Sequence, residues 1–249
     1  MRLKLGKHAP KFHPRTLFYH NYHVSVPPPP SVSYYYKRLL RDSWQMLGND
    51  TVGDCTFADA GHQIMLNNSY TGKGPNPSLD DIIKGYSAVS GYDQTAGSND
   101  NGCAITDVMN YRNTVGIGGD KISAWVQIDP TNLEHVRQAI HVFGGVQIGV
   151  QLPNSAMDQF NSNQDWTVVA NDGGIAGGHD IFGCGYPDGN SLAIISWGRA
   201  LLASLPWIAK YCDEMYATVS MDWLDMRSGL SPSHLNLDAL KQDLLALQQ

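Results

Sequence analysis

The chain has 249 residues, a formal net charge of −6, 42% hydrophobic and 16% charged residues, which is a globular composition. Its few Lys and Arg are scattered and form no basic field for phosphate groups, so we expect no nucleic acid partner. The N-terminal stretch lacks the apolar run of a signal peptide, and no stretch reaches the about 18 apolar residues of a membrane span. We therefore expect a soluble, cytoplasmic protein with no membrane partner and no export by a signal peptide.

Neither the cysteines nor the histidines form a recognisable metal site or disulfide framework. The cysteines contain no C-x-x-C pair and are few for so long a chain: Cys55, Cys103, Cys184 and Cys212. Four histidines gather near the N-terminus without regular helical spacing: His8, His13, His20 and His23. A metal site there is the less favoured alternative to a solvated arm. We predict no metal and no cofactor.

The N-terminal stretch predicts an arm followed by a single domain. Residues 1–25 show no regular period, and the VPPPPS stretch at 26–31 is stiff and extended, because successive prolines fix φ and remove backbone donors. The length suits one domain, of two lobes, over residues 26–225. A final amphipathic helix is expected within residues 226–249.

Helical periods dominate the first half of the chain. Apolar residues recur at helical intervals from Cys55 to Leu66, with Asp54 placed to accept backbone N–H bonds as the N-cap. Ser78 predicts the cap of a second helix, and a third is expected near residues 106–115. Cys55 would then lie in the first turn of the first helix.

Strand-like alternation dominates the second half, which makes the pattern that of an α+β fold. The capping pair Thr131 and Glu134 predicts a helix before residue 145, and PDGN at 187–190 is a turn of the hairpin kind. A short helix is expected around residues 205–211. The predicted strands are residues 121–128, 146–152, 165–170, 179–186, 191–198 and 215–221.

Two of these elements carry a combination of residues that can do chemistry. A helix N-terminus favours the thiolate form of a cysteine, and Cys55 lies there. His179 begins a predicted strand after several glycines, which let another backbone approach it closely. A cysteine nucleophile and a histidine base facing each other from a helix and a strand would be able to attack an amide.

These residues resemble the signature of the papain-like cysteine peptidases. Asn49 stands six residues before Cys55, and Gly53 stands two before it, where that family has a Gln and a Gly. The resemblance implies that Cys55 and His179 are catalytic and that Asn49 binds the oxyanion together with the N–H of Cys55. It also implies a two-lobed fold, with the cysteine helix in a helical lobe of about residues 26–120 and the histidine in an antiparallel β-rich lobe of residues 121–225.

Further stretches follow in the order of that family, over about residues 26–221. GGHDIFGCGY resembles the histidine strand, and IISWG resembles the strand in which an Asn orients the histidine. Here Ile195 replaces that Asn and cannot accept the imidazole N–H. Ser196 is the candidate to orient His179, whereas Asp180 is expected to point to the opposite face of the strand. Trp197 would shield the site from water.

Other positions depart from the family. The charge of Asp54 opposes a thiolate at Cys55. The paired glycines that accommodate a peptide are replaced by Ile105 and Thr106, which argues against extended substrate binding. Val52 replaces the usual partner of Cys103, which predicts a free thiol. The arm is shorter than the inhibitory pro-segment of the family, so activity would have to be held in check in another way.

Two functions follow from these matches and departures. The first is a papain-like cysteine hydrolase that cleaves a peptide or a peptide-like amide with Cys55 and His179. The alternative is a catalytically impaired papain-like fold that acts as a structural or interaction protein of a bacteriophage particle, because the wording also resembles uncharacterised papain-like proteins of tailed bacteriophages and prophages. The partners would be a peptide or protein substrate in the first case. They would be other virion proteins, and the location a virion, in the second.

Overall fold

The computed structural model describes residues 3–21, 28–220, 223 and 242. The helix predicted within residues 226–249 lies outside this part of the chain, save for residue 242. Within the described residues, no helix is long and apolar enough to cross a membrane.

The three helices predicted in the first half are confirmed. They are α1 (Cys55–Thr71), α2 (Leu79–Ser90) and α3 (Ile105–Thr114). Ser78 caps α2 through a complete capping box with Asp81. Asp54 does occupy the N-cap position of α1, but its side chain makes no capping hydrogen bond, so that part of the prediction is wrong.

A seven-stranded sheet forms the other half of the molecule, in the order β1-β2-β7-β3-β4-β5-β6. All neighbouring strands pair antiparallel except β1 with β2. The strands are β1 (Leu17–Phe18), β2 (Ile122–Gln127), β3 (Val146–Pro153), β4 (Ile175–Gly185), β5 (Ser191–Ser196), β6 (Arg199–Ser204) and β7 (Cys212–Ser220). The helices of this half are α4 (Leu133–Phe143), α5 (Asn154–Asn161) and α6 (Leu205–Tyr211), and short 3-10 turns lie at Tyr19–Asn21 and Tyr35–Arg38. The predicted α+β architecture is confirmed.

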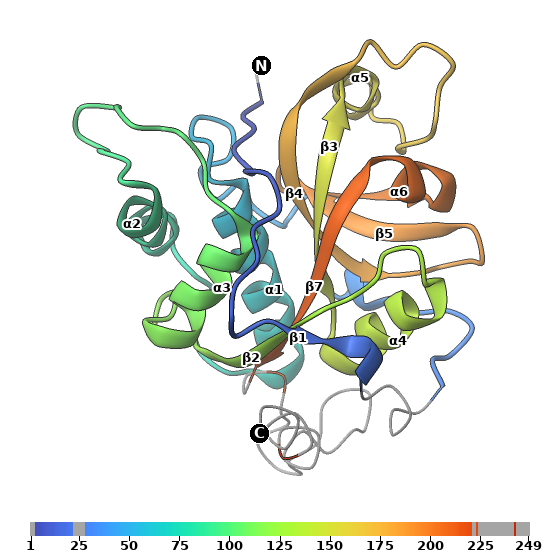
Figure 1. Cartoon of the computed structure of the whole chain (residues 1–249), viewed down its shortest axis with the longest axis horizontal. Helices are drawn as coiled ribbons and strands as arrows, with labels where there is room; N and C mark the ends of the chain where they lie inside the picture. The colour runs from blue at the N-terminus through green and yellow to red at the C-terminus, as the bar shows by residue number, and fades with distance from the viewer. Residues whose placement is uncertain (1–2, 22–27, 221–222, 224–241, 243–249) are drawn as a thin grey trace.

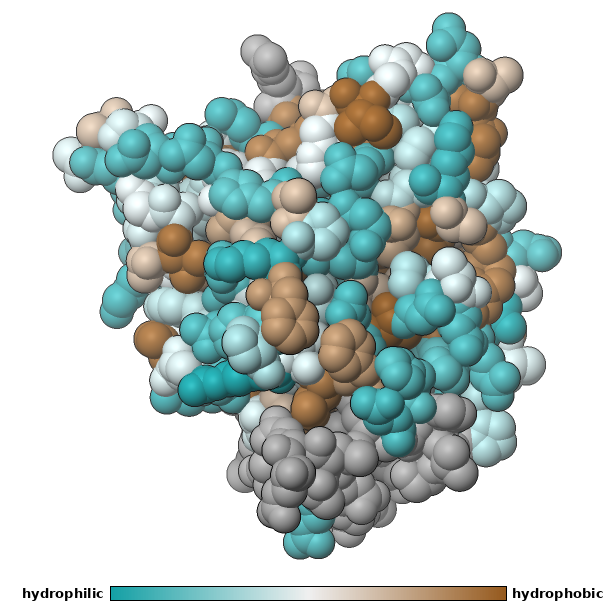
Figure 2. All heavy atoms as spheres, viewed as in Figure 1, coloured by the Kyte–Doolittle hydropathy of each residue, from teal (hydrophilic) through white to brown (hydrophobic). Residues whose placement is uncertain are grey.

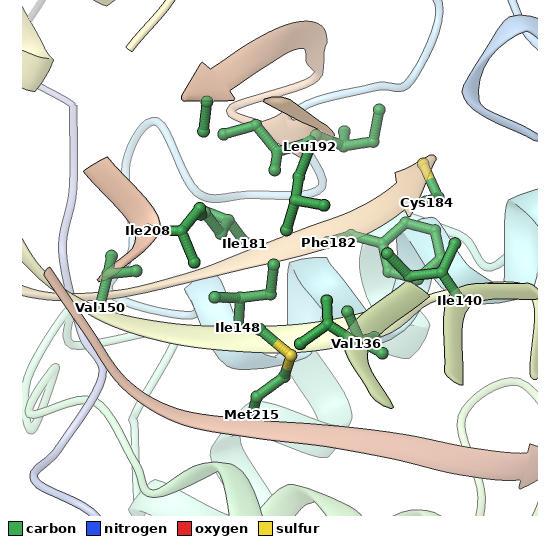
Figure 3. Close-up of a cluster of buried hydrophobic side chains, with 14 of the residues drawn as sticks. Val136, Ile140, Ile148, Val150, Ile181, Phe182, Cys184, Leu192, Ile208 and Met215 are labelled. Atoms are coloured by element: carbon green, nitrogen blue, oxygen red, sulfur yellow. The ribbon is translucent and has the colours of Figure 1, made fainter. Parts of the chain in front are cut away.

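Each half has its own hydrophobic core, with α1 between them. One core joins α1, α2 and α3 through buried residues such as Phe57, Ile82 and Val108. The larger core lies in the sheet half, where Figure 3 shows Ile148 and Met215 beside side chains of α4. Because α1 is covered on both sides, polar residues of this helix are buried as well as apolar ones. The arrangement is that of a papain-like two-lobed fold (Figure 1).

Three details of the second half differ from the sequence prediction. Residues 165–170 form no strand, because only Trp166 reaches the sheet, through an isolated bridge to Ala203, and Val168 stays 42% exposed. The cap of α4 is Asn132, whose side chain accepts from the His135 N–H, and Thr131 instead bonds Asp129. Helix α5 and strand β6 were not predicted.

Candidate active site

Cys55 is the first residue of α1, as the sequence predicts. The residue is only 1% exposed. Burial raises the pKa of the Cys55 thiol well above its ordinary value, and the Asp180 carboxyl raises it further, whereas the backbone N–H of Asp180 works in the opposite direction. The thiol is therefore neutral in this arrangement.

His179 lies near the start of β4 and is also buried. Its Nε2 is 2.9 Å from Ser196 Oγ on β5, while its Nδ1 has no hydrogen-bond partner among the described residues. The ring stacks on Trp197, with 4.2 Å between the ring centroids and 17° between the planes. Burial lowers the pKa of His179 to about 3, so the imidazole is neutral at physiological pH.

The structure brings Cys55 beside the dipeptide of His179 and Asp180, since both the carboxyl and the N–H of Asp180 act on the thiol. Ser196 holds one nitrogen of the ring, which leaves Nδ1 as the nitrogen available to a nucleophile. Asp180 does not bond the ring: its carboxyl accepts from Gln147 Nε2 at 3.2 Å. Cys55 and His179 are thus both buried and neutral, and Asp180, the residue after His179, acts on the thiol.

Trp197 occupies a backbone conformation that is rare for its residue type. It and Gly198 form the two-residue turn between β5 and β6, with φ values of 44° and 72°. A non-glycine residue in this region costs about 1 to 3 kcal/mol. Two contacts of the Trp197 side chain offset this strain. The indole stacks on His179, and its Nε1 donates to the Lys4 carbonyl at 3.1 Å.

Asn49 is buried in the loop before α1, and its Nδ2 donates to the Val52 carbonyl at 3.2 Å. That bond uses one of the two amide hydrogens and fixes the side chain in the loop that leads to Cys55. Asp54 is buried in the same loop, and burial raises the pKa of Asp54 well above its ordinary value, while a hydrogen bond from the Asn49 side chain lowers it. Asp54 in turn raises the pKa of the Cys55 thiol, which is the opposition to a thiolate that the sequence predicts.

The described N-terminal residues run between the two lobes, where Figure 1 shows them in blue between α1–α3 and the sheet, and we call the space that they occupy the cleft. On the side of the helical lobe, the Lys4 N–H donates to the Asn49 carbonyl at 3.3 Å. The backbone of Cys103 donates to the Gly6 carbonyl at 2.9 Å and accepts from the His8 N–H at 3.1 Å. These bonds are those of a β-bridge, so the loop before α3 binds an extended peptide.

Gly6 is the point of closest approach in this segment. A Cβ atom on this residue would lie 1.8 Å from the Gly53 carbonyl oxygen, and a Cβ on Gly102 would lie 1.8 Å from the Gly6 oxygen. No side chain fits there without displacing the backbone. The segment is therefore fitted to the cleft by a glycine directly over the loop that carries Cys55.

On the side of the sheet, the Lys7 N–H donates to the carbonyl of Gly178, the residue before His179, at 3.1 Å. The Lys7 ammonium is fully buried and lies 3.0 Å from Asp213 Oδ1 and 3.1 Å from Glu214 Oε1. The segment thus covers the histidine strand while its lysine side chain enters the sheet lobe. Figure 2 shows that hydrophobic residues on this face form small groups separated by hydrophilic ones.

Two expectations about the cleft bear on this segment. Ile105 and Thr106 were expected to argue against extended substrate binding, yet the backbone of Cys103, just before them, makes a bridge to an extended segment of the same chain. The arm was expected to be too short to resemble the inhibitory pro-segment of the family, and residues 3–8 pass over the loop that carries Cys55. All four cysteines are free, as expected for Cys103, whose Sγ lies 3.1 Å from Thr56 Oγ1.

Metal ligands do not gather in the part of the chain that the structure describes. No group of three or more His, Cys, Asp or Glu residues there could hold a metal ion. His8 bonds the Asn101 carbonyl and the ring of His13 lies tilted against Trp125, while His23 lies outside the described residues. His62 of α1 bonds the Gln45 carbonyl.

Comparison with known proteins agrees with this architecture. The chain is similar to xylellain, a cysteine protease from Xylella fastidiosa, at 15% identity and a TM-score of 0.62 over 88% of this chain and 98% of that one. It is also similar to the proform of Amb a 11, a cysteine protease and ragweed pollen allergen, at 15% identity and a TM-score of 0.55 over 79% and 67% of the chains. No protein-family model and no curated protein sequence matches. At these identities the likeness establishes the papain-like fold.

The residues that sequence reasoning missed are those that occupy and line the cleft. Lys7, Asp213 and Glu214 come together from positions more than 200 residues apart. One signal was available, since two adjacent acidic residues open a strand that is otherwise apolar and buried. A buried pair of acidic residues predicts a cationic partner, but it does not identify the residue that carries the positive charge.

Proposed function

We propose that this protein is a papain-like cysteine hydrolase that cleaves a peptide or a peptide-like amide, and that it is latent while residues 3–8 fill its cleft. The observation that carries the proposal is the bound segment itself. An extended backbone is hydrogen-bonded to both walls of the cleft, beside Cys55 and the histidine strand. A site that binds its own chain in this way is suited to bind a peptide substrate in the same place.

In the proposed reaction, Cys55 Sγ attacks the amide carbonyl carbon while His179 takes the thiol proton. The N–H of Cys55 and the amide N–H₂ of Asn49 hold the oxyanion. The C–N bond then breaks, and the amine leaves with the proton from His179. Water, activated by the same imidazole, cleaves the thioester and restores the thiol.

The latent state opposes this chemistry through burial. With the segment in place, burial raises the pKa of Cys55 and lowers the pKa of His179 to about 3, so proton transfer between them is unfavourable. Withdrawal of residues 3–8 would admit water, lower the pKa of the thiol and raise that of the imidazole. Opening would therefore both expose and activate the pair.

Labelling of Cys55 by an epoxide peptide inhibitor, mapped by mass spectrometry from pH 5 to 9, tests this function. Gly6→Ala should open the cleft, because the new Cβ meets the Gly53 oxygen. The inhibitor should then label Cys55 of this variant at least about tenfold faster than Cys55 of the wild type. Gly189→Ala is the matched control, since a Cβ there meets nothing within 4 Å. If Cys55 in the opened protein reacts no faster than Cys103, the function is excluded.

The buried, neutral Cys55 also favours a second function, a catalytically silent papain-like fold that serves as a structural or interaction protein. Assignment of that fold to a bacteriophage particle rests on the sequence resemblance. Mass spectrometry of purified particles, compared with the free protein in the lysate, tests it. Absence of the chain from the particles would contradict this alternative.

A further inference from the structure

The slot that holds the Lys7 side chain is built by three neighbouring strands. Gly149 on β3 pairs with Asp180 on β4 at one side and with Glu214 on β7 at the other. Directly paired residues present their side chains on the same face of a sheet. The two carboxyl groups therefore flank a position that has no side chain of its own.

Gly149 makes the slot possible. A Cβ at this position would lie 2.2 Å from Lys7 Cε and 2.6 Å from Glu214 Cγ. The lysine stem thus occupies the volume that any other residue at position 149 would fill. The slot ends at Glu214 and Asp213, which receive the ammonium group.

The carboxylates of Asp213 and Glu214 are each held by a hydrogen bond from another side chain of the protein, in addition to their contacts with Lys7. Gln151 Nε2 donates to Asp213 Oδ2 at 2.6 Å, and Tyr216 Oη donates to Glu214 Oε2 at 3.0 Å. Burial by itself lowers the pKa of Lys7, but Glu214 and Asp213 outweigh that effect and keep its pKa above the ordinary value. Burial raises the pKa of Asp180 well above its ordinary value, Asp59 and Glu214 raise it further, and Lys7 lowers it, so the charges that face the ammonium are those of Asp213 and Glu214. The slot is therefore arranged for a cation.

We propose that this slot is the specificity pocket of the cleft, that it selects peptides with a lysine side chain, and that Lys7 occupies it as a stand-in for the substrate. The substrate part of this inference rests on the proposed function. The lysine backbone bonds Gly178, next to His179, so a chain bound through this slot passes directly beside the proposed base. Asp213, Glu214 and Gly149 are then specificity-determining residues.

Binding measured without catalysis tests the pocket. The full chain carrying Gly6→Ala and Cys55→Ala is titrated with a labelled synthetic peptide of residues 4–11, and with the same peptide carrying norleucine in place of Lys7. The lysine peptide should bind roughly 10- to 100-fold more tightly, the range expected for buried hydrogen bonds to charged groups. Glu214→Gln should reduce this ratio to about threefold or less, whereas Glu134→Gln, an exposed glutamate on α4, should leave it unchanged.

Gly149→Ala provides a second variant that keeps every charge and fills only the slot, and it too should abolish the preference. If Gly6→Ala does not fold, Lys7→Met in the full chain with Cys55→Ala replaces it as the opened protein. Equal affinity for the two peptides, including absence of binding for both, overturns the proposal. A lysine preference in a protein whose Cys55 resists the epoxide would keep the pocket and exclude the hydrolase, so the two failures are distinguishable.

Discussion

The wall of the cleft formed by the helical lobe contacts residues 4–8 mainly through backbone groups, with one exposed contact from Asp100 to Lys4, whereas the wall formed by the sheet also uses buried side chains. Asn49 and Cys103 offer carbonyl and N–H groups on the first wall. Trp197, Asp213 and Glu214 offer an indole and two carboxylates on the second. Backbone groups bind any extended chain, and side chains distinguish one chain from another. In the proposed function, the helical wall would supply affinity, and the sheet wall would supply selectivity and the base.

The largest effect is expected at the base on the sheet wall. In the Gly6→Ala background, His179→Ala should slow epoxide labelling of Cys55 at pH 7 by about 100-fold or more, because the thiol loses its proton acceptor. His62→Ala is the control, since His62 is another buried histidine but bonds the Gln45 carbonyl. Equal slowing by both variants would mean that the loss comes from unfolding, which circular dichroism of each protein would reveal.

The next effect concerns the ion pairs between the segment and the sheet wall. Lys7→Met should speed labelling of Cys55 by roughly 10- to 100-fold, because removal of the ammonium releases the segment from Asp213 and Glu214. Lys4→Met is the matched control, since the Lys4 ammonium is 45% exposed and lies 3.4 Å from Asp100. If the two variants react alike, the slot does not hold the segment in place.

A smaller effect is expected at the residue that orients the histidine. Ser196→Ala removes the hydroxyl that lies 2.9 Å from His179 Nε2. Stacking on Trp197 would still hold the ring, so we expect labelling in the Gly6→Ala background to fall only about three- to tenfold. Ser196→Thr, which keeps the hydroxyl, should recover most of the rate. Failure of this recovery would indicate that packing, and not the hydrogen bond, is what the serine provides.

Burial of the histidine predicts a dependence of stability on pH. The pKa of His179 is lowered from 6.5 to about 3, so between these values the unfolded state binds a proton that the folded state does not. The contribution to stability is complete above pH 6.5 and is lost as the pH falls toward 3. In urea titrations, His179→Gln should therefore reduce the slope of unfolding free energy against pH by up to about 1.4 kcal/mol per pH unit. Identical slopes would show that the ring is solvated.

The smallest effect is expected on the helical wall. Cys103→Ala removes a buried thiol but keeps the N–H and C=O groups that bind residues 6–8. Peptide affinity and the labelling rate of Cys55 should change by less than about twofold, while stability falls by about 1 kcal/mol from lost packing. A large loss of peptide affinity would show that this wall, too, reads its ligand through a side chain.

The sequence predicted best the features that depend on local pattern. The helical period after Cys55, the capping box at Ser78 and the alternation in β3 were each readable from a few adjacent residues. The cap of α4 was misassigned by one residue, because Thr131 and Asn132 can both accept a backbone N–H and only the fold chooses between them. Residues 165–170 alternate like a strand, yet they meet the edge strand β6 only through the bridge between Trp166 and Ala203.

The candidate site was predicted in part. The structure brings His179 into contact with Ser196 and Trp197, and it places Asn49 in the loop that leads to Cys55. The roles of these residues in catalysis stay predictions. The extent of burial was not readable from the sequence, although it is the largest cause that shifts the pKa values of Asp54, Cys55 and His179.

The sequence by itself determined the α+β pattern, the position of the cysteine at a helix start and the histidine on a strand, because periodicity and capping act between near neighbours. Only the tertiary structure decided what fills the cleft. The contact of Lys7 with Asp213 spans 206 positions, and no local pattern specifies such a pair. Burial, set by the packing of two lobes around α1, likewise decided that Cys55 and His179 are both neutral.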